Sequence, residues 1–203
     1  CRQAAQWRGT GWPELVMAVN LSAVQFRDRN LGQEGMAILA ESGLDPVGLE
    51  LELTESLLLQ SEGSVLATLL EWKAQGIQLS IDDFGTGYSS LAYLKRFKVD
   101  KLKIDRSFLV NLLDGSEDRA IVQAMIQIAR SLNLKTLAEG VEEAAQAEQL
   151  KVMGCDQLQG YLYAKPLPAA ELTGWLAAQT DPRQGPRSGP GHQVQSHQDS
   201  LGV

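Results

Sequence analysis

Carboxylates and carboxamides recur at the ends of short apolar runs in this chain. They are Asn20 after LVMAV, Glu52 and Glu55 in LELELTE, Asp82 and Asp83 after IQLSI, Asp105 in KLKID, Glu139 in LKTLAE and Gln159 in DQLQG. Acids gathered in a partly buried site repel one another, so they either take up protons or bind a cation. Carboxylate and amide oxygens are the ligands of hard ions such as Mg²⁺ or Mn²⁺. The pattern therefore predicts a site for divalent cations.

Asp82 and Asp83 are adjacent at the end of one apolar run. Because side chains alternate along a strand, we expect one of the two to point inward and the other toward the following loop. Two acids side by side can serve two cations. Any one of these acids alone is explained as well by a solvated strand end or a helix cap, so the prediction depends on their recurrence.

Lys103 lies two residues before Asp105, so both side chains point to the same side of their strand. A lysine among acids can be a structural counter-ion. It can also be a catalytic group that orients a water molecule and stabilises developing negative charge. The spacing alone does not choose between these roles.

Each apolar run is the length of a strand and precedes a longer amphipathic stretch, which is typical of repeated βα units. We predict strands near 15–20, 49–54, 77–82, 101–105, 134–139 and 156–160, and helices near 32–43, 62–75, 89–96, 117–132, 142–153 and 169–178. Right-handed crossovers then give a parallel sheet, either closed as a barrel or open and doubly wound. In both cases the carboxyl ends of the strands meet on one face, which makes the acids neighbours.

Composition narrows the class of protein. A chain of 203 residues with 44% hydrophobic residues can bury the core of one domain. The net charge of −7 argues against DNA or RNA binding, although a small anion could bind through metal ions. Two cysteines, Cys1 and Cys155, and the lack of a long apolar run predict a cytoplasmic location, leaving open a membrane anchor elsewhere in a longer protein.

The two ends of the chain differ in character from its middle. We predict one domain over residues 1–179 and a disordered tail or linker over 180–203, because the tail is rich in Pro, Gly, Ser and Gln. The chain opens at Cys1 without a methionine, within what reads as the last turns of a helix. We therefore expect it to be a fragment of a longer protein.

Six segments carry a specific resemblance. VNLSAVQF, LELTES, IDDFGTGYSSL, KLKIDRSF, LAEGVE and QLQGYLYAKPL, in this order and at these spacings, resemble the EAL domain family of cyclic di-GMP phosphodiesterases. The resemblance runs from about Cys1 to Leu176. It implies a modified (β/α)8 barrel of the TIM type that acts in bacterial signalling. The reaction it implies is hydrolysis of cyclic di-GMP to linear pGpG with Mg²⁺ or Mn²⁺, two ions in all.

The resemblance also implies roles for individual residues. Asn20, Glu52 and Asp82 match ligands of a first metal, and Asp83 and Asp105 match those of a second. Lys103 matches the lysine that holds the attacking water, and Glu139 matches a glutamate that acts as general base or beside the metal. Glu142 and Gln159 match further site positions. Glu55 matches the residue that steadies the loop from Asp83 to Ser90, which lies near the family's dimer contact and is compatible with a homodimer.

One departure from the family pattern concerns the Glu-Ala-Leu stretch. No such stretch precedes Asn20, and the glutamate that completes the first metal site is missing with it. The six strands then correspond to the last six of eight, and we expect weak activity or none from the chain alone. The alternative is a non-catalytic receptor for cyclic di-GMP or a protein-interaction module. The retained acids and Lys103 favour the enzyme, in a parent protein with sensor or cyclase-like domains.

Overall fold

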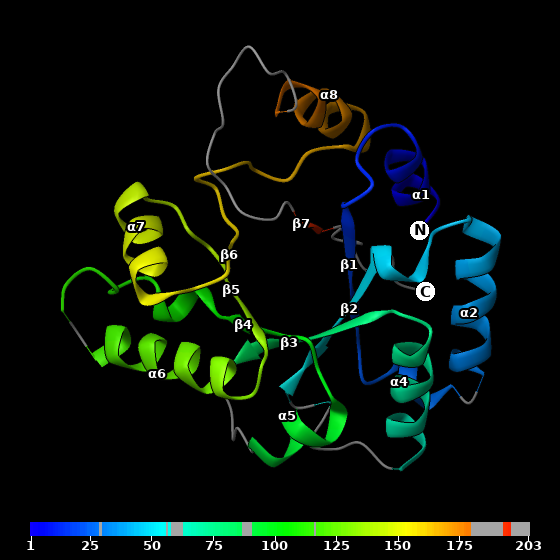
Figure 1. Ribbon diagram of the computed structural model, residues 1–203, viewed down its shortest axis with the longest axis horizontal. Coiled ribbons are helices and arrows are strands. Elements are labelled where there is room, and N and C mark those ends of the chain that lie inside the picture. Colours follow the sequence, from blue (N-terminus) through cyan, green and yellow to red (C-terminus); the bar gives the residue numbers. More distant parts are fainter. Residues whose placement is uncertain are drawn as a thin grey trace.

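Parallel strands form the centre of the molecule and helices surround them (Figure 1). The computed structural model describes residues 1–28, 30–55, 57, 63–86, 91–115, 117–179 and 193–195. The strands are β1 (Val16–Leu21), β2 (Leu49–Thr54), β3 (Gln78–Phe84), β4 (Lys101–Ile104), β5 (Lys135–Ala138), β6 (Gln157–Leu158) and β7 (Gln193–Gln195). They form one parallel sheet in the order β6-β5-β4-β3-β2-β1-β7. The six strands predicted from apolar runs are confirmed.

The helices also follow the prediction. They are α1 (Arg2–Gly9), α2 (Leu31–Ser42), α4 (Gly63–Ala74), α5 (Leu91–Phe97), α6 (Glu117–Ser131), α7 (Ala144–Met153) and α8 (Ala169–Gln179), with short 3-10 turns η1 (Gln25–Arg27), η2 (Pro46–Gly48) and η3 (Arg106–Phe108). Helix α6 shows why they form: Val122, Met125, Ile126 and Ala129 recur at helical spacing and are buried. None of the helices in the described part has the length and apolar character needed to cross a bilayer.

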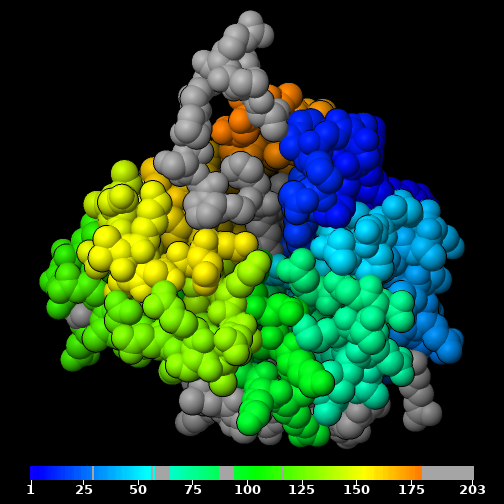
Figure 2. All heavy atoms as spheres, viewed as in Figure 1, coloured from blue at the N-terminus to red at the C-terminus, as the bar shows by residue number. Residues whose placement is uncertain are grey.

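The helices lie outside the sheet, as in a barrel, and not on both of its faces, as in a doubly wound fold (Figure 1). In Figure 2 the colours follow one another around the molecule, and the orange residues of α8 return to the blue residues of α1. Trp7 on α1 donates a hydrogen bond from Nε1 to Oγ1 of Thr173 on α8, at 2.8 Å. The fold is therefore a truncated parallel barrel, which is the predicted class.

The short strand β7 lies within the segment predicted to be a tail. It pairs in parallel with β1, Val16 opposite Gln193. Residues 180–192 and 196–203 lie outside the described residues, so the boundary of the tail at 180 stays a prediction.

Charged residues on alternate positions of two strands build a polar interior. Glu50 and Glu52 share one face of β2, and Lys101 and Lys103 share one face of β4, because side chains repeat every two residues. Lys101 Nζ lies 2.6 Å from Glu50 Oε2, and all four residues are buried. These charges are tolerated because they are paired. The second lysine, Lys103, lies nearer the carboxyl ends of the strands and organises the site.

Candidate metal centre

The Lys103 ammonium joins acids from three strands. Its Nζ lies 2.8 Å from Glu52 Oε2 on β2, 2.9 Å from Asp82 Oδ1 on β3 and 2.8 Å from Glu139 Oε1, directly after β5. The side chains of Lys103 and Glu52 are fully buried. Burial alone would lower the pKa of Lys103, but Glu139, Glu52 and Asp82 together raise it above its ordinary value. The amine therefore stays protonated and acts as a counter-ion.

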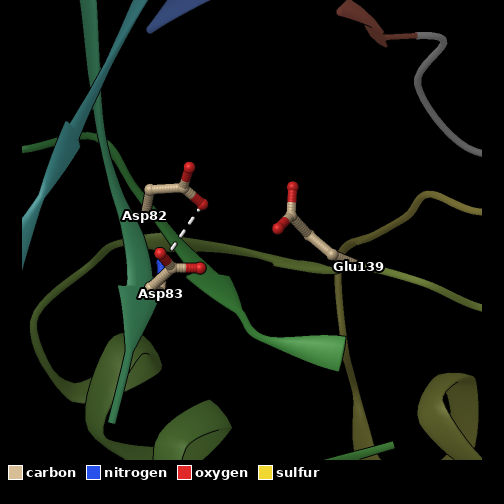
Figure 3. Close-up of side chains that lie close together, drawn as sticks. All are labelled: Asp82, Asp83 and Glu139. Carbon is tan, nitrogen blue, oxygen red and sulfur yellow. Dashed lines mark hydrogen bonds between the residues drawn. The ribbon is translucent and has the colours of Figure 1, made fainter. Parts of the chain in front are cut away.

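Asp82 and Asp83 interrupt the regular strand. The pairing of β3 with β4 shifts between Ile81 and Phe84, and Asp83 has a φ of +54°. Its backbone N–H donates to Oδ1 of Asp82 at 3.1 Å (Figure 3). Asp82 is half-buried and Asp83 is exposed, as expected for one side chain that points inward and one that points toward the following loop. Ligand atoms of Asp82, Asp83 and Glu139 lie within 4.8 Å of one another.

Mutual repulsion among these acids shows in their pKa values. Burial, followed by the charges of Asp82 and Asp105, raises the pKa of Asp83. Burial is also the main cause that raises the pKa of Glu139 to about 7; Asp82 and Glu52 add to it, and Lys103 opposes it. A cation between these carboxylates would cancel the repulsion. Oxygen donors in this arrangement fit a hard divalent ion such as Mg²⁺ or Mn²⁺.

Asn20 and Asp105 lie at the same end of the sheet. Strand pairing places Asn20 beside Glu52, and Asn20 is exposed. The Asp105 carboxylate accepts a hydrogen bond from the Ser107 N–H at 3.0 Å and caps η3. It influences Asp83 electrostatically, but it does not belong to the group of Asp82, Asp83 and Glu139. The roles of Asn20 and Asp105 as ligands stay predictions.

The other predicted residues lie around this centre. Glu142 forms an ion pair with Arg106, Oε1 to Nη2 at 2.9 Å. Gln159 joins the site through its backbone, which donates to Ala138 O at 2.8 Å and accepts from Val141 N at 2.9 Å. Glu55 is buried directly after β2. The loop that Glu55 is predicted to steady includes residues 87–90, which lie outside the described residues, so that role stays a prediction.

The comparison with known families agrees with this geometry. The model of the EAL domain matches residues 1–166. This chain belongs to the EAL domain family. MucR of Pseudomonas aeruginosa, a bifunctional diguanylate cyclase/cyclic di-GMP phosphodiesterase, is 46% identical over 177 residues, which are 87% of this chain and 26% of MucR. The chain thus spans about a quarter of the length of that relative.

Two solved structures resemble this EAL domain. The PaMucR phosphodiesterase in complex with c-di-GMP superposes with a TM-score of 0.80 at 46% identity, over 85% of this chain and 70% of that one. BlrP1 of Klebsiella pneumoniae, in a manganese/cy-diGMP complex, superposes with a TM-score of 0.72 at 28% identity, over 81% of this chain and 42% of that one.

One cavity of this EAL domain lies away from the acids. It has a volume of about 480 Å³ and lies where the strands begin, since residues at the starts of β1, β3, β4, β5 and β6 line it: Val16, Gln78, Lys101, Lys135 and Gln157. The acids lie at the opposite, carboxyl ends. In a barrel, function concentrates at the carboxyl ends and stability at the amino ends.

Sequence reasoning gave no role to Arg106 or Gly160, and both shape the site. Arg106 could have been noticed as a basic residue directly after a strand-end acid. Gly160 follows Gln159, and a Cβ added there would lie 2.1 Å from the oxygen and 2.3 Å from the nitrogen of Val141. No local pattern in the sequence indicates the close approach of Gly160 to the backbone of Val141.

We expect Gly160→Ala to damage the site. The Cβ would collide with backbone, which cannot swing aside, so the turn that carries Glu139 must shift. The free energy of unfolding should fall by about 2 kcal/mol or more, as overpacking of a core does, and Mn²⁺ should bind more weakly. The matched control is Gly174→Ala on α8, where the added Cβ meets nothing within 4 Å. Urea unfolding of both variants tests this: equal stability of the two would contradict the proposed contact.

The raised pKa of Glu139 predicts how stability depends on pH without metal. Between about 4.5, the ordinary value, and about 7, the folded chain holds a proton that the unfolded chain has released. The contribution of Glu139 to the free energy of unfolding is therefore complete below pH 4.5. It is lost as the pH rises through 7, and the loss is on the order of 2–3 kcal/mol. Urea midpoints at pH 5 and pH 8 in a chelator should show this loss, and saturating Mn²⁺ should remove it. A midpoint that rises from pH 5 to pH 8 in the chelator would contradict the assignment.

Proposed function

We propose that this EAL domain hydrolyses cyclic di-GMP to linear pGpG with two Mg²⁺ or Mn²⁺ ions. The observation that carries the proposal is the buried Lys103 that gathers Glu52, Asp82 and Glu139 at one end of the barrel. The relative MucR is a cyclic di-GMP phosphodiesterase, and BlrP1 forms a complex with manganese and the same dinucleotide. Both support the proposed substrate and metal.

Asp82 and Asp83 would hold the ions, with Glu52, Asn20 and Asp105 as further ligands, and Glu139 would lie beside them as general base or as another ligand. Two ions held there would supply a lowered pKa of water and positive charge to neutralise the phosphoryl oxygens. Residues of the chain supply the acceptor for the proton of the attacking water. Glu139 lies beside Asp82 and Asp83 and would accept a proton from the attacking water. If Glu139 instead holds an ion, as the family pattern also allows, it would position that ion, and the ion would supply the lowered pKa of the water.

Lys103 has a different part in the proposed reaction. Its raised pKa makes it a poor base, so it acts as a charged donor. The ammonium holds three carboxylates at fixed distances and, when the substrate is present, orients the attacking water. A group positioned in advance stabilises developing charge without reorganising during the reaction.

We also propose the setting of this reaction. The domain would work in the cytoplasm as part of a longer protein, with a sensor or cyclase-like domain on the same chain and the ability to form a homodimer. The support is that MucR is bifunctional and that this chain covers 26% of it.

The test compares the chain with a longer form that includes its upstream segment. Both are incubated with cyclic di-GMP and Mn²⁺, and the products are separated by chromatography. We expect pGpG from the longer form and its loss in Asp82→Asn. Asp114→Asn changes an exposed carboxylate in a turn and should leave the rate unchanged. Binding of cyclic di-GMP without product in every form would reject hydrolysis in favour of a receptor.

A further inference from the structure

Arg106 lies across the turn that carries Glu139. It directly follows Asp105, and a Cβ placed on Gly140 would lie 2.5–2.8 Å from Cβ, Cγ and Cδ of Arg106. Gly140 has a φ of +72°, which glycine adopts without strain. The stem of Arg106 thus occupies the space that a side chain at position 140 would fill. This close approach brings the guanidinium to the carboxyl edge, between Asp105 and Glu139 in the strand order.

The guanidinium is held but not enclosed. Its Nη2 lies 2.9 Å from Glu142 Oε1, and the side chains of Arg106 and Glu142 are 61% and 43% exposed. An exposed ion pair of this kind contributes little to stability. A guanidinium carries five N–H donors, and one ion pair leaves others available toward solvent. Arg106 is therefore oriented at the site and still able to bind a ligand.

The proposed substrate needs a second cation besides Lys103 at this site. Lys103 is fully buried and its ammonium is already paired with three carboxylates, so its charge serves the reacting end of the site. The proposed substrate has two phosphates, and the metal centre would act on one of them. The second phosphate is an anion that must lie next to an acidic edge. A planar guanidinium matches a phosphate with paired hydrogen bonds.

We propose that Arg106 is a substrate-binding residue that contacts the phosphate that is not cleaved, and that Glu142 positions it. This inference rests on the proposed function. It assigns Arg106 to recognition of the dinucleotide and not to the reaction at the scissile phosphate.

The test uses two substrates that differ in the second phosphate. Cyclic di-GMP has two phosphates, whereas bis(p-nitrophenyl) phosphate has one and lacks guanine. In Arg106→Ala the KM for cyclic di-GMP should rise about 10- to 100-fold, as loss of a charge-assisted contact does, with kcat within about threefold. Hydrolysis of bis(p-nitrophenyl) phosphate and the affinity for Mn²⁺ should not change. Arg106→Lys keeps the charge and should recover most of the KM, and Arg119→Ala on α6 is the matched surface control.

Each other outcome overturns the inference. A parallel loss on both substrates would mean that Arg106 only supports the Glu139 turn. An unchanged KM would mean that it touches no substrate. An Arg106→Lys variant as impaired as Arg106→Ala, with a KM that does not respond to ionic strength, would indicate a guanine contact instead. Failure of the proposed function is separate, because the unmodified longer form would then give no pGpG.

Discussion

Replacing Lys103 by methionine is expected to abolish hydrolysis and to destabilise the metal-free chain. The change leaves Glu52, Asp82 and Glu139 without their shared counter-ion in a buried site. Breaking a buried ion pair in this way costs about 3–5 kcal/mol of folding free energy. Loss of one positioned donor lowers kcat by about 10²–10³-fold, and the disturbed carboxylates should lower it further. Urea unfolding and the rate of pGpG formation measure the two effects.

The chain offers a matched control on the same strand. Lys101 is also buried and pairs with Glu50, but at the opposite end of β4, beside the cavity. Lys101→Met should cost a similar folding free energy, yet leave the affinity for Mn²⁺ and kcat within a few-fold of the original, when assayed below the unfolding midpoint. Equal loss of activity in both variants would mean that Lys103 only stabilises the fold and has no role in the reaction. Full activity in Lys103→Met would contradict the account of the site.

Glu139→Gln is expected to move stability and activity in opposite directions. In the metal-free chain the ionised carboxylate is disfavoured by burial and by its acidic neighbours, so its pKa is about 7. A neutral amide of the same shape removes that repulsion and should raise the urea midpoint at pH 8. Hydrolysis should fall by about 10²–10⁴-fold, because a general base is lost. Measurement of both quantities on one preparation shows whether the site is strained for its function.

The control for this variant is Glu50→Gln, which removes the same charge from the Lys101 pair. It should lower stability, since Lys101 then loses its buried counter-ion, and it should leave Mn²⁺ binding unchanged. Glu139→Gln that binds Mn²⁺ and hydrolyses cyclic di-GMP normally would exclude Glu139 from both proposed roles.

The strands and helices could be predicted because their signals are local. Alternation within LELEL places Glu50 and Glu52 on one face, and KLK does the same for Lys101 and Lys103. The predicted strand 49–54 matches β2 at both ends. Convergence of the acids followed from the parallel topology, which places the carboxyl ends on one face.

What could not be predicted depends on contacts between strands. The spacing left Lys103 as either counter-ion or catalytic group, and only the pairing of β2, β3, β4 and β5 brings three acids to one amine. The composition of β3 also did not indicate its irregular pairing with β4 or the positive φ of Asp83. The position of the Arg106 side chain depends on the absence of a Cβ at Gly140, a residue 34 positions later in the sequence.

The most direct test of the central claim is to locate manganese in crystals of the longer form with cyclic di-GMP, from anomalous scattering at the manganese edge. The account predicts anomalous peaks among the carboxylates of Asp82, Asp83 and Glu139, next to a phosphate of the dinucleotide. It would be contradicted by crystals at saturating Mn²⁺ in which the dinucleotide is bound and no peak lies among these three side chains.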